Sequence, residues 1–129
     1  MISNCLIRNN MANLTGGGVS GGQLVNCVVF EHSAVSGGGI DSANSAFCTV
    51  SRNSPDGIHA VTGINCIVYG NTADNWSNSA LTYSCTTPNP GGPGNITSPP
   101  NLANDLAGDF HLQTASPCID AGTNAGIMI

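Results

Sequence analysis

One short pattern recurs four times in this chain: Asn4-Cys5-Leu6-Ile7, Asn26-Cys27-Val28-Val29, Phe47-Cys48-Thr49-Val50 and Asn65-Cys66-Ile67-Val68. Cys85 continues the series, and the five cysteines are separated by 18 to 22 residues. A polar residue follows each copy, and glycine follows further on in the first three, at 16–18, 37–39 and 57. Gly and Asn both tolerate the left-handed backbone of tight corners. Such short strands bury their faces only when coils stack ~4.8 Å apart. The sequence therefore predicts an all-β fold, a right-handed parallel β-helix of about five to six coils.

The alternation of residues in the repeat predicts which side chains point inward. If the cysteines point inward, so do the residues two positions later, which are Ile7, Val29, Val50 and Val68. Cys5, Cys27, Cys48 and Cys66 then form a ladder of small fillers. Five residues after the cysteines, Asn10, Asn53 and Asn71 are expected to stack as an amide ladder, which His32 interrupts once.

The regular repeats fade after Cys85. We expect residues 1–85 to form the coils, and residues 86–129 to form irregular terminal coils and a C-terminal cap of the same domain. No comparable cap is visible at the N-terminus. The chain is therefore expected to continue into further coils of a longer protein, or to stack head to tail on another copy of itself.

Composition excludes two classes of partner. Charged residues make up 7% of the 129 residues, and the net charge is −5 with Arg8 and Arg52 as the only strong cations. Binding to nucleic acid needs a basic surface, so we expect none. There is also no run of ~18 apolar residues, so no membrane-spanning segment is expected.

The C-terminal part resembles a known family. Gly108-Asp109-Phe110-His111-Leu112-Gln113, followed by Ser116-Pro117-Cys118-Ile119-Asp120-Ala121-Gly122, is similar to the end of bacterial right-handed parallel β-helix proteins of the pectate-lyase-like superfamily, in particular the choice-of-anchor type. The glycine-rich corners and Arg8-Asn9-Asn10-Met11-Ala12 resemble polymorphic outer-membrane repeats, which act as adhesins. The resemblance implies an extracellular or cell-surface location. It does not select an activity, because this superfamily includes lyases, hydrolases, adhesins and spacers.

The cysteines permit one candidate disulfide. Neighbours in a ladder hold their Cβ atoms further apart than a disulfide prefers, so the ladder thiols are expected to be free. Cys85 and Cys118 lie in the irregular part, where a bridge is more feasible. No pair of cysteines or histidines has the spacing of zinc ligands, so we expect neither a metal nor a cofactor.

Two groups of polar residues resemble catalytic sites. Ser20, Asp41 and His59 are expected in one column on successive coils, but Asp41 then lies between the other two, whereas a serine hydrolase needs the histidine in the middle. Asp56 and Asp74 are expected to share a column ~5 Å apart, which makes them the best candidate carboxylate pair for hydrolysis or metal binding. The simpler interpretation is that both carboxylates cap turns, and no catalytic residue is assigned.

An apolar stripe is the remaining candidate site. Leu6, Val28, Phe30, Ile67 and Tyr69 are expected on the outer face of one sheet, where they could bind a polysaccharide or a protein unless a loop of the chain covers them. The sequence thus favours a non-enzymatic structural or surface-binding module, such as a stalk, an adhesin-like surface or a filament subunit. The alternative is a fragment of a carbohydrate-active β-helix enzyme, either a polysaccharide lyase or a glycoside hydrolase.

Overall fold

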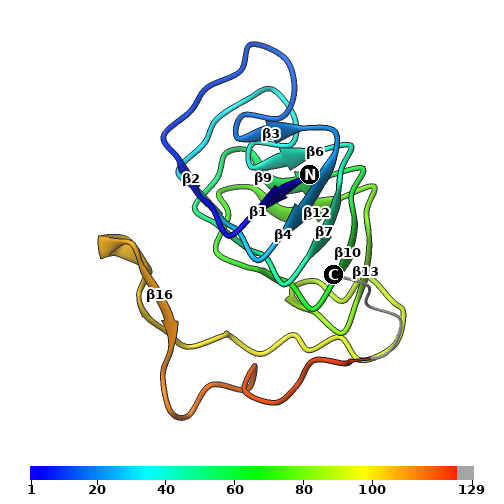
Figure 1. Ribbon diagram of the computed structural model, residues 1–129, viewed down its shortest axis with the longest axis vertical. Coiled ribbons are helices and arrows are strands. Elements are labelled where there is room, and N and C mark those ends of the chain that lie inside the picture. The colour runs from blue at the N-terminus through cyan, green and yellow to red at the C-terminus, as the bar shows by residue number, and fades with distance from the viewer. Residues whose placement is uncertain (125–129) are drawn as a thin grey trace.

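The computed structural model, which describes residues 1–124, is a parallel β-solenoid of about five turns (Figure 1). Each full coil contributes one short strand to each of three parallel sheets. Sheet A contains β1 (Ile2–Ser3), β4 (Gln23–Val25), β7 (Asn44–Ala46), β10 (Thr62–Ile64) and β13 (Ala80–Thr82). Sheet B contains β2 (Leu6–Arg8), β5 (Val28–Phe30), β8 (Thr49–Ser51), β11 (Ile67–Val68) and β14 (Cys85–Thr86). Sheet C contains β3 (Val19–Ser20), β6 (Ile40–Asp41), β9 (Asp56–His59) and β12 (Asp74–Ser77).

The predicted all-β parallel solenoid is confirmed, and its register follows the cysteine-centred repeat. Ile7 pairs with Val29, Val29 with Val50, and Val50 with Val68. Val29 and Val50 are fully buried and Val68 is 1% exposed. Cys27, Cys48 and Cys66 also belong to the core, whereas Cys5 is exposed because it lies in the first coil.

Single left-handed residues turn the chain at the corners of the solenoid. The corner between sheets A and B is formed by one such residue in every coil, with φ between 49° and 55°: Asn4, Asn26, Phe47, Asn65 and Tyr83. A second column follows sheet B and a third follows sheet C. We call the first set the A/B corner column. Because one residue makes each turn, the strands stay short and the coils superimpose.

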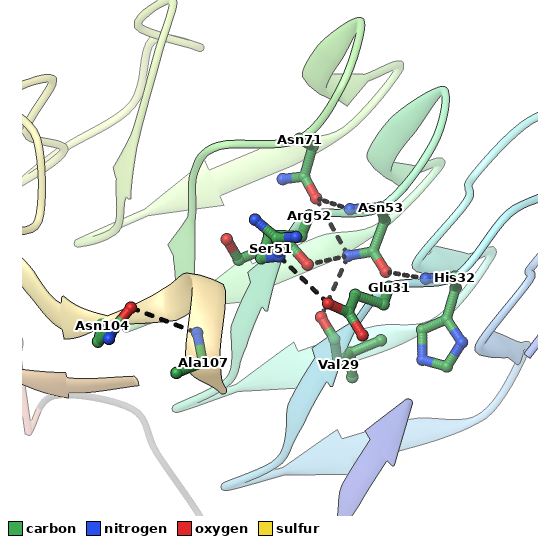
Figure 2. Close-up of polar contacts among 9 residues, drawn as sticks. All are labelled: Val29, Glu31, His32, Ser51, Arg52, Asn53, Asn71, Asn104 and Ala107. Carbon is green, nitrogen blue, oxygen red and sulfur yellow. Dashed lines mark hydrogen bonds and ion pairs between the residues drawn. The ribbon is translucent and has the colours of Figure 1, made fainter. Parts of the chain in front are cut away.

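The interior is stabilised by a polar ladder as well as by aliphatic packing. Asn53 donates from Nδ2 to the Val29 carbonyl (3.1 Å), and its Oδ1 accepts from the backbone N–H of His32 (3.0 Å; Figure 2). Asn71 repeats both contacts one coil later, with the Val50 carbonyl and the Asn53 N–H. Each amide thus satisfies two buried backbone groups of the preceding coil, which would otherwise be costly to bury.

The expectation that His32 interrupts this ladder is wrong. Its Nδ1 accepts from the Asn10 N–H (2.9 Å), and its Nε2 donates to the Ile7 carbonyl (3.0 Å). These are the same two backbone positions, one coil earlier, that Asn53 contacts. The neutral imidazole with its proton on Nε2 therefore replaces the amide, because it also carries one donor and one acceptor.

The register slips by one residue in the last coil. Cys85 pairs with Ile67 and Thr86 pairs with Val68, so Ser84 and not Cys85 follows Cys66 in the ladder. The Ser84 hydroxyl accepts from the Cys66 N–H, which fixes this alignment. A shift of one residue moves a side chain to the other face of a strand. Cys85 therefore lies on the outer face of sheet B.

The two ends of the solenoid differ. At the C-terminal end, Asn95 bonds to the Leu81 carbonyl and the Ser84 N–H, and Ile96 pairs with the backbone of Ser84 and Thr86. Trp76 donates from Nε1 to the Pro88 carbonyl (2.8 Å). Residues 87–96 thus cover this end and are called the end cover below. At the other end, no further strand among residues 1–124 is paired to β1, β2 or β3.

Residues 101–124 form an arm that runs outside the stack of coils (Figure 1). The arm contains β15 (Leu102–Asn104), a 3-10 turn (Asp105–Ala107) and β16 (Asp109–Leu112), with β15 and β16 antiparallel. It contacts sheet B through Phe110, whose ring lies 4.8 Å from that of Phe30. Of the segment expected as terminal coils and cap, residues 87–96 lie over the end, residues 101–124 lie along the side, and residues 125–129 are outside the described part.

Candidate functional site

The open N-terminal end is the first candidate site. Leu6, Met11 and Leu14 are 61%, 79% and 73% exposed there, and the outer edges of β1, β2 and β3 present unpaired backbone groups. No acidic residue occurs before Glu31, so Arg8 is the only charged side chain of this end. An apolar end with a single charged side chain and unpaired strand edges is suited to pairing with more β structure.

The predicted apolar stripe is mostly covered by the chain itself. Phe30, expected on the outer face of the sheet, is 3% exposed because Phe110 of the arm packs on it. Tyr69 is half-buried, and its hydroxyl bonds to the Thr97 carbonyl. Val28 and Ile67 are also half-buried, which leaves Leu6 as the exposed member. The stripe is therefore an internal contact between sheet B and the segment that follows the coils.

The candidate carboxylate pair shares a column, since Asp56 and Asp74 are register partners. The two side chains have different surroundings. Asp56 is 6% exposed and accepts from the Gly37 N–H and from the Ser77 hydroxyl, whereas Asp74 is exposed. Both oxygens of Asp56 are thus engaged with neighbouring coils, as expected of a carboxylate that holds a turn.

Sheet C contains a column of polar residues that extends one coil further than the sequence analysis considered. Ser20, Asp41, His59 and Ser77 are successive register partners. The column expected from the sequence is present, and His59 bonds to its neighbour Asp41 at 2.7 Å. Burial raises the pKa of Asp41, but hydrogen bonds from His59 and Ser42 outweigh it, so the pKa lies below its ordinary value.

Ser77 gives this column the order that a serine hydrolase requires, with the histidine between carboxylate and hydroxyl. Its hydroxyl, however, donates to Asp56 and not to His59. The cavity lined by Phe47 and Tyr83 and the one lined by Tyr69 and Pro100 lie on other faces. We therefore assign these residues to holding adjacent coils together.

Cys85 and Cys118 are both free thiols, and the structure places them in the lining of one cavity between the last coil and the arm. The nearby Cys85 thiol lowers the pKa of Cys118 to about 7, and the Cys118 thiol and burial raise the pKa of Cys85, whose Sγ donates to the Ser98 carbonyl (3.2 Å). The two thiols lie near each other because the register slip turns Cys85 outward, toward the arm.

A cavity of about 480 Å³ lies beside these thiols, between the A/B corner column and the arm. Sequence analysis missed it, because the arm has no repeat that predicts its path. One signal was visible: Phe47 and Tyr83 stand where other repeats have Asn4, Asn26 and Asn65. Both aromatic residues line the cavity.

Among residues 1–124, no three His, Cys, Asp or Glu side chains gather closely enough to hold a metal ion. Within the same residues, no helix has the length and apolarity needed to cross a membrane. The sequence matches no protein-family model, no curated protein and no solved structure.

Proposed function

We propose that this protein is a non-enzymatic structural module of an extracellular or cell-surface protein, and that it docks through its open N-terminal end. The observation that carries the proposal is the contrast between the two ends. One end has unpaired strand edges with exposed Leu6, Met11 and Leu14, and the other is sealed by the end cover. Natural proteins usually protect strand edges that have no partner.

The occupant we propose for this end is a second copy of the chain. The end cover lies over the last strands and would have to be displaced for head-to-tail stacking, so we expect two copies to meet through their N-terminal ends. A two-fold arrangement of this kind makes an isologous and closed dimer. Electrostatics permit the approach. All seven acidic residues lie beyond the first coil, beginning with Glu31, and Arg8 is the one charged side chain within the first coil.

The enzymatic alternative has weaker support. Its best candidate pair, Asp56 and Asp74, has one carboxylate engaged by Gly37 and Ser77. A polysaccharide lyase acting on acidic sugars would also need cationic groups around the substrate carboxylate. Arg52 is instead paired with Glu31 at 3.4 Å.

The test is light scattering coupled to size-exclusion chromatography over a concentration series. We expect the wild-type protein to change from monomer to dimer as its concentration rises. Leu6→Lys places a charge on edge strand β2 and should keep the protein monomeric. Leu106→Lys, at a residue that is 74% exposed on the arm, is the matched control and should dimerise like the wild type.

Two results would overturn the proposal. A wild-type protein that stays monomeric at every concentration does not dock through this end. Growth beyond a dimer would mean that the C-terminal end also takes part, which contradicts the closed arrangement. Circular dichroism of Leu6→Lys checks that the coils remain folded.

A further inference from the structure

The cavity beside the arm has the dimensions of a small-molecule site. Its volume of about 480 Å³ lies within the ~300–1,000 Å³ common for such sites. One wall is the A/B corner column of the last three coils, where Phe47, Asn65 and Tyr83 follow one another. The opposite wall is the end of the described arm, from Asp120 to Asn124.

Asn65 fixes the distance between these two walls. Its Nδ2 donates to the Thr123 carbonyl and its Oδ1 accepts from the Thr123 N–H, both at 2.8 Å. The amide thus pairs with the arm's backbone as a neighbouring strand would. Gly122 permits this approach, since a Cβ there would lie 2.9 Å from Asn65 Oδ1. The cavity is therefore held open by a specific contact.

The corner residues on either side of Asn65 are unusual for their backbone. Phe47 and Tyr83 have φ values of 55° and 49°, in the left-handed region where bulky side chains are uncommon. Asparagine, found at Asn4, Asn26 and Asn65 of the same column, suits this conformation better. The two aromatic side chains lie two coils apart, or roughly 10 Å at the spacing of parallel strands. Phe47 and Tyr83, the two residues of the A/B corner column that suit its left-handed backbone least, thus both line the cavity.

The lining combines apolar rings with hydrogen-bonding groups and includes no cation. Asp120 and Asn124 supply a carboxylate and an amide, whereas neither Arg8 nor Arg52 is among the lining residues. Pyranose rings have apolar C–H faces that pack on aromatic rings, and hydroxyl groups that donate to carboxylate and amide oxygens. An acidic sugar would instead meet the Asp120 carboxylate with no cation to offset the repulsion.

We propose that this cavity binds a neutral saccharide, with sugar rings packed against Phe47 and Tyr83 and hydroxyl groups bonded to Asp120 and Asn124. The inference goes beyond docking at the open end and does not depend on it. The cavity involves the last three coils and the arm, whereas docking involves the first coil.

The experiment is isothermal titration calorimetry of the full chain with neutral hexasaccharides, namely cellohexaose, xylohexaose and maltohexaose, and with hexagalacturonate as the acidic probe. We expect at least one neutral probe to bind and the acidic probe to bind more weakly. Phe47→Asn and Tyr83→Asn give the corner column its more frequent residue, so both variants should fold. Each should raise the Kd of the neutral probe by about tenfold or more, as expected for loss of an aromatic anchor. Leu106→Asn, on the exposed 3-10 turn, is the control and should leave the Kd unchanged.

Four outcomes would overturn the proposal. The first is no binding of any neutral probe, and the second is stronger binding of hexagalacturonate than of the neutral probes. The third is unchanged affinity in Phe47→Asn and Tyr83→Asn, which would place any saccharide elsewhere on the protein. Thermal melting separates the roles of the rings: if either Asn variant unfolds more readily than wild type, the aromatic side chains serve packing and the proposal fails as well.

Discussion

At the scale of the residue, His32 shows how different side chains can perform the same task in one column. Its imidazole contacts the Asn10 N–H and the Ile7 carbonyl, where Asn53 and Asn71 use an amide. The difference between the side chains is that imidazole titrates near neutral pH and the amide does not. Burial lowers the pKa of His32, and its hydrogen bonds with the Ile7 and Asn10 backbone oppose that shift only in part.

This difference predicts that His32 makes the free energy of unfolding depend on pH. Below pH 6.5 the unfolded chain protonates His32 while the folded chain does not, so the free energy of unfolding falls as pH decreases. Above pH 6.5 both states are neutral at this residue and its contribution is constant. The slope approaches ~1.4 kcal/mol per pH unit between the folded pKa and 6.5. His32→Asn keeps both backbone contacts and should remove this contribution, as measured by urea unfolding between pH 7.5 and 5. An unchanged slope in the variant would assign the effect to another group.

At the scale of the element, the sequence predicted the coils well and the arm poorly. Each coil is specified by several independent columns, such as Ile7, Val29, Val50 and Val68, so an error in one column is corrected by the others. The arm has no such redundancy, and nothing in its sequence reveals that Phe110 packs on Phe30. The sequence therefore left open whether the stripe is exposed or covered, and the structure shows that a segment after the coils covers its aromatic members.

The register slip at Cys85, which affects the candidate site, could not be predicted from the sequence either. Intervals of 18 and 19 residues both fit a repeat of variable length, so spacing alone did not show which face Cys85 occupies. The Ser84 hydroxyl, which bonds to the Cys66 N–H, decides the register. The cavity could not be predicted either, because its second wall is the arm, whose path the sequence did not predict.

The proximity of Cys85 to Cys118 predicts an oxidation that ties the arm to the last coil. With glutathione disulfide, the Cys118 thiolate should attack and release one glutathione, and Cys85 should then displace the second to form the protein disulfide. The product closes a long loop, which in the chain-entropy account stabilises the folded state by roughly 3–4 kcal/mol.

Peptide mapping should find Cys85 joined to Cys118, with Cys27, Cys48 and Cys66 still free. Hydrogen exchange of residues 101–124 should slow on oxidation, and Cys118→Ser should abolish the effect. Cross-links among the ladder cysteines would contradict the prediction.

At the scale of the whole molecule, one end of the solenoid is sealed and the other is open. Asn95 is central to the seal, because its side chain bonds both the Leu81 carbonyl and the Ser84 N–H at the last strand edges. Removing these two contacts costs about 0.5–1.5 kcal/mol each. Strand edges that the end cover hides would then become available for pairing.

Asn95→Ala should therefore change how copies assemble. With both ends accessible, we expect oligomers larger than a dimer, whose size increases with concentration in light scattering. Asn89→Ala is the control, because Asn89 lies in the same cover but bonds only to the nearby Gly91 N–H. Dimers alone in Asn95→Ala would show that the cover is held without this side chain.

The left-handed residues of the A/B corner column have one further consequence. Each of these residues turns the backbone and keeps its side chain outside the aliphatic core. The same position can therefore hold asparagine, as at Asn4, Asn26 and Asn65, or an aromatic residue, as at Phe47 and Tyr83, in the same kind of coil. Selection can thus act on the two parts of a repeat separately. The interior must be inherited almost unchanged, while the corner is free to diversify. A lineage of such proteins would keep one architecture and acquire new ligands through substitutions at a single position per coil.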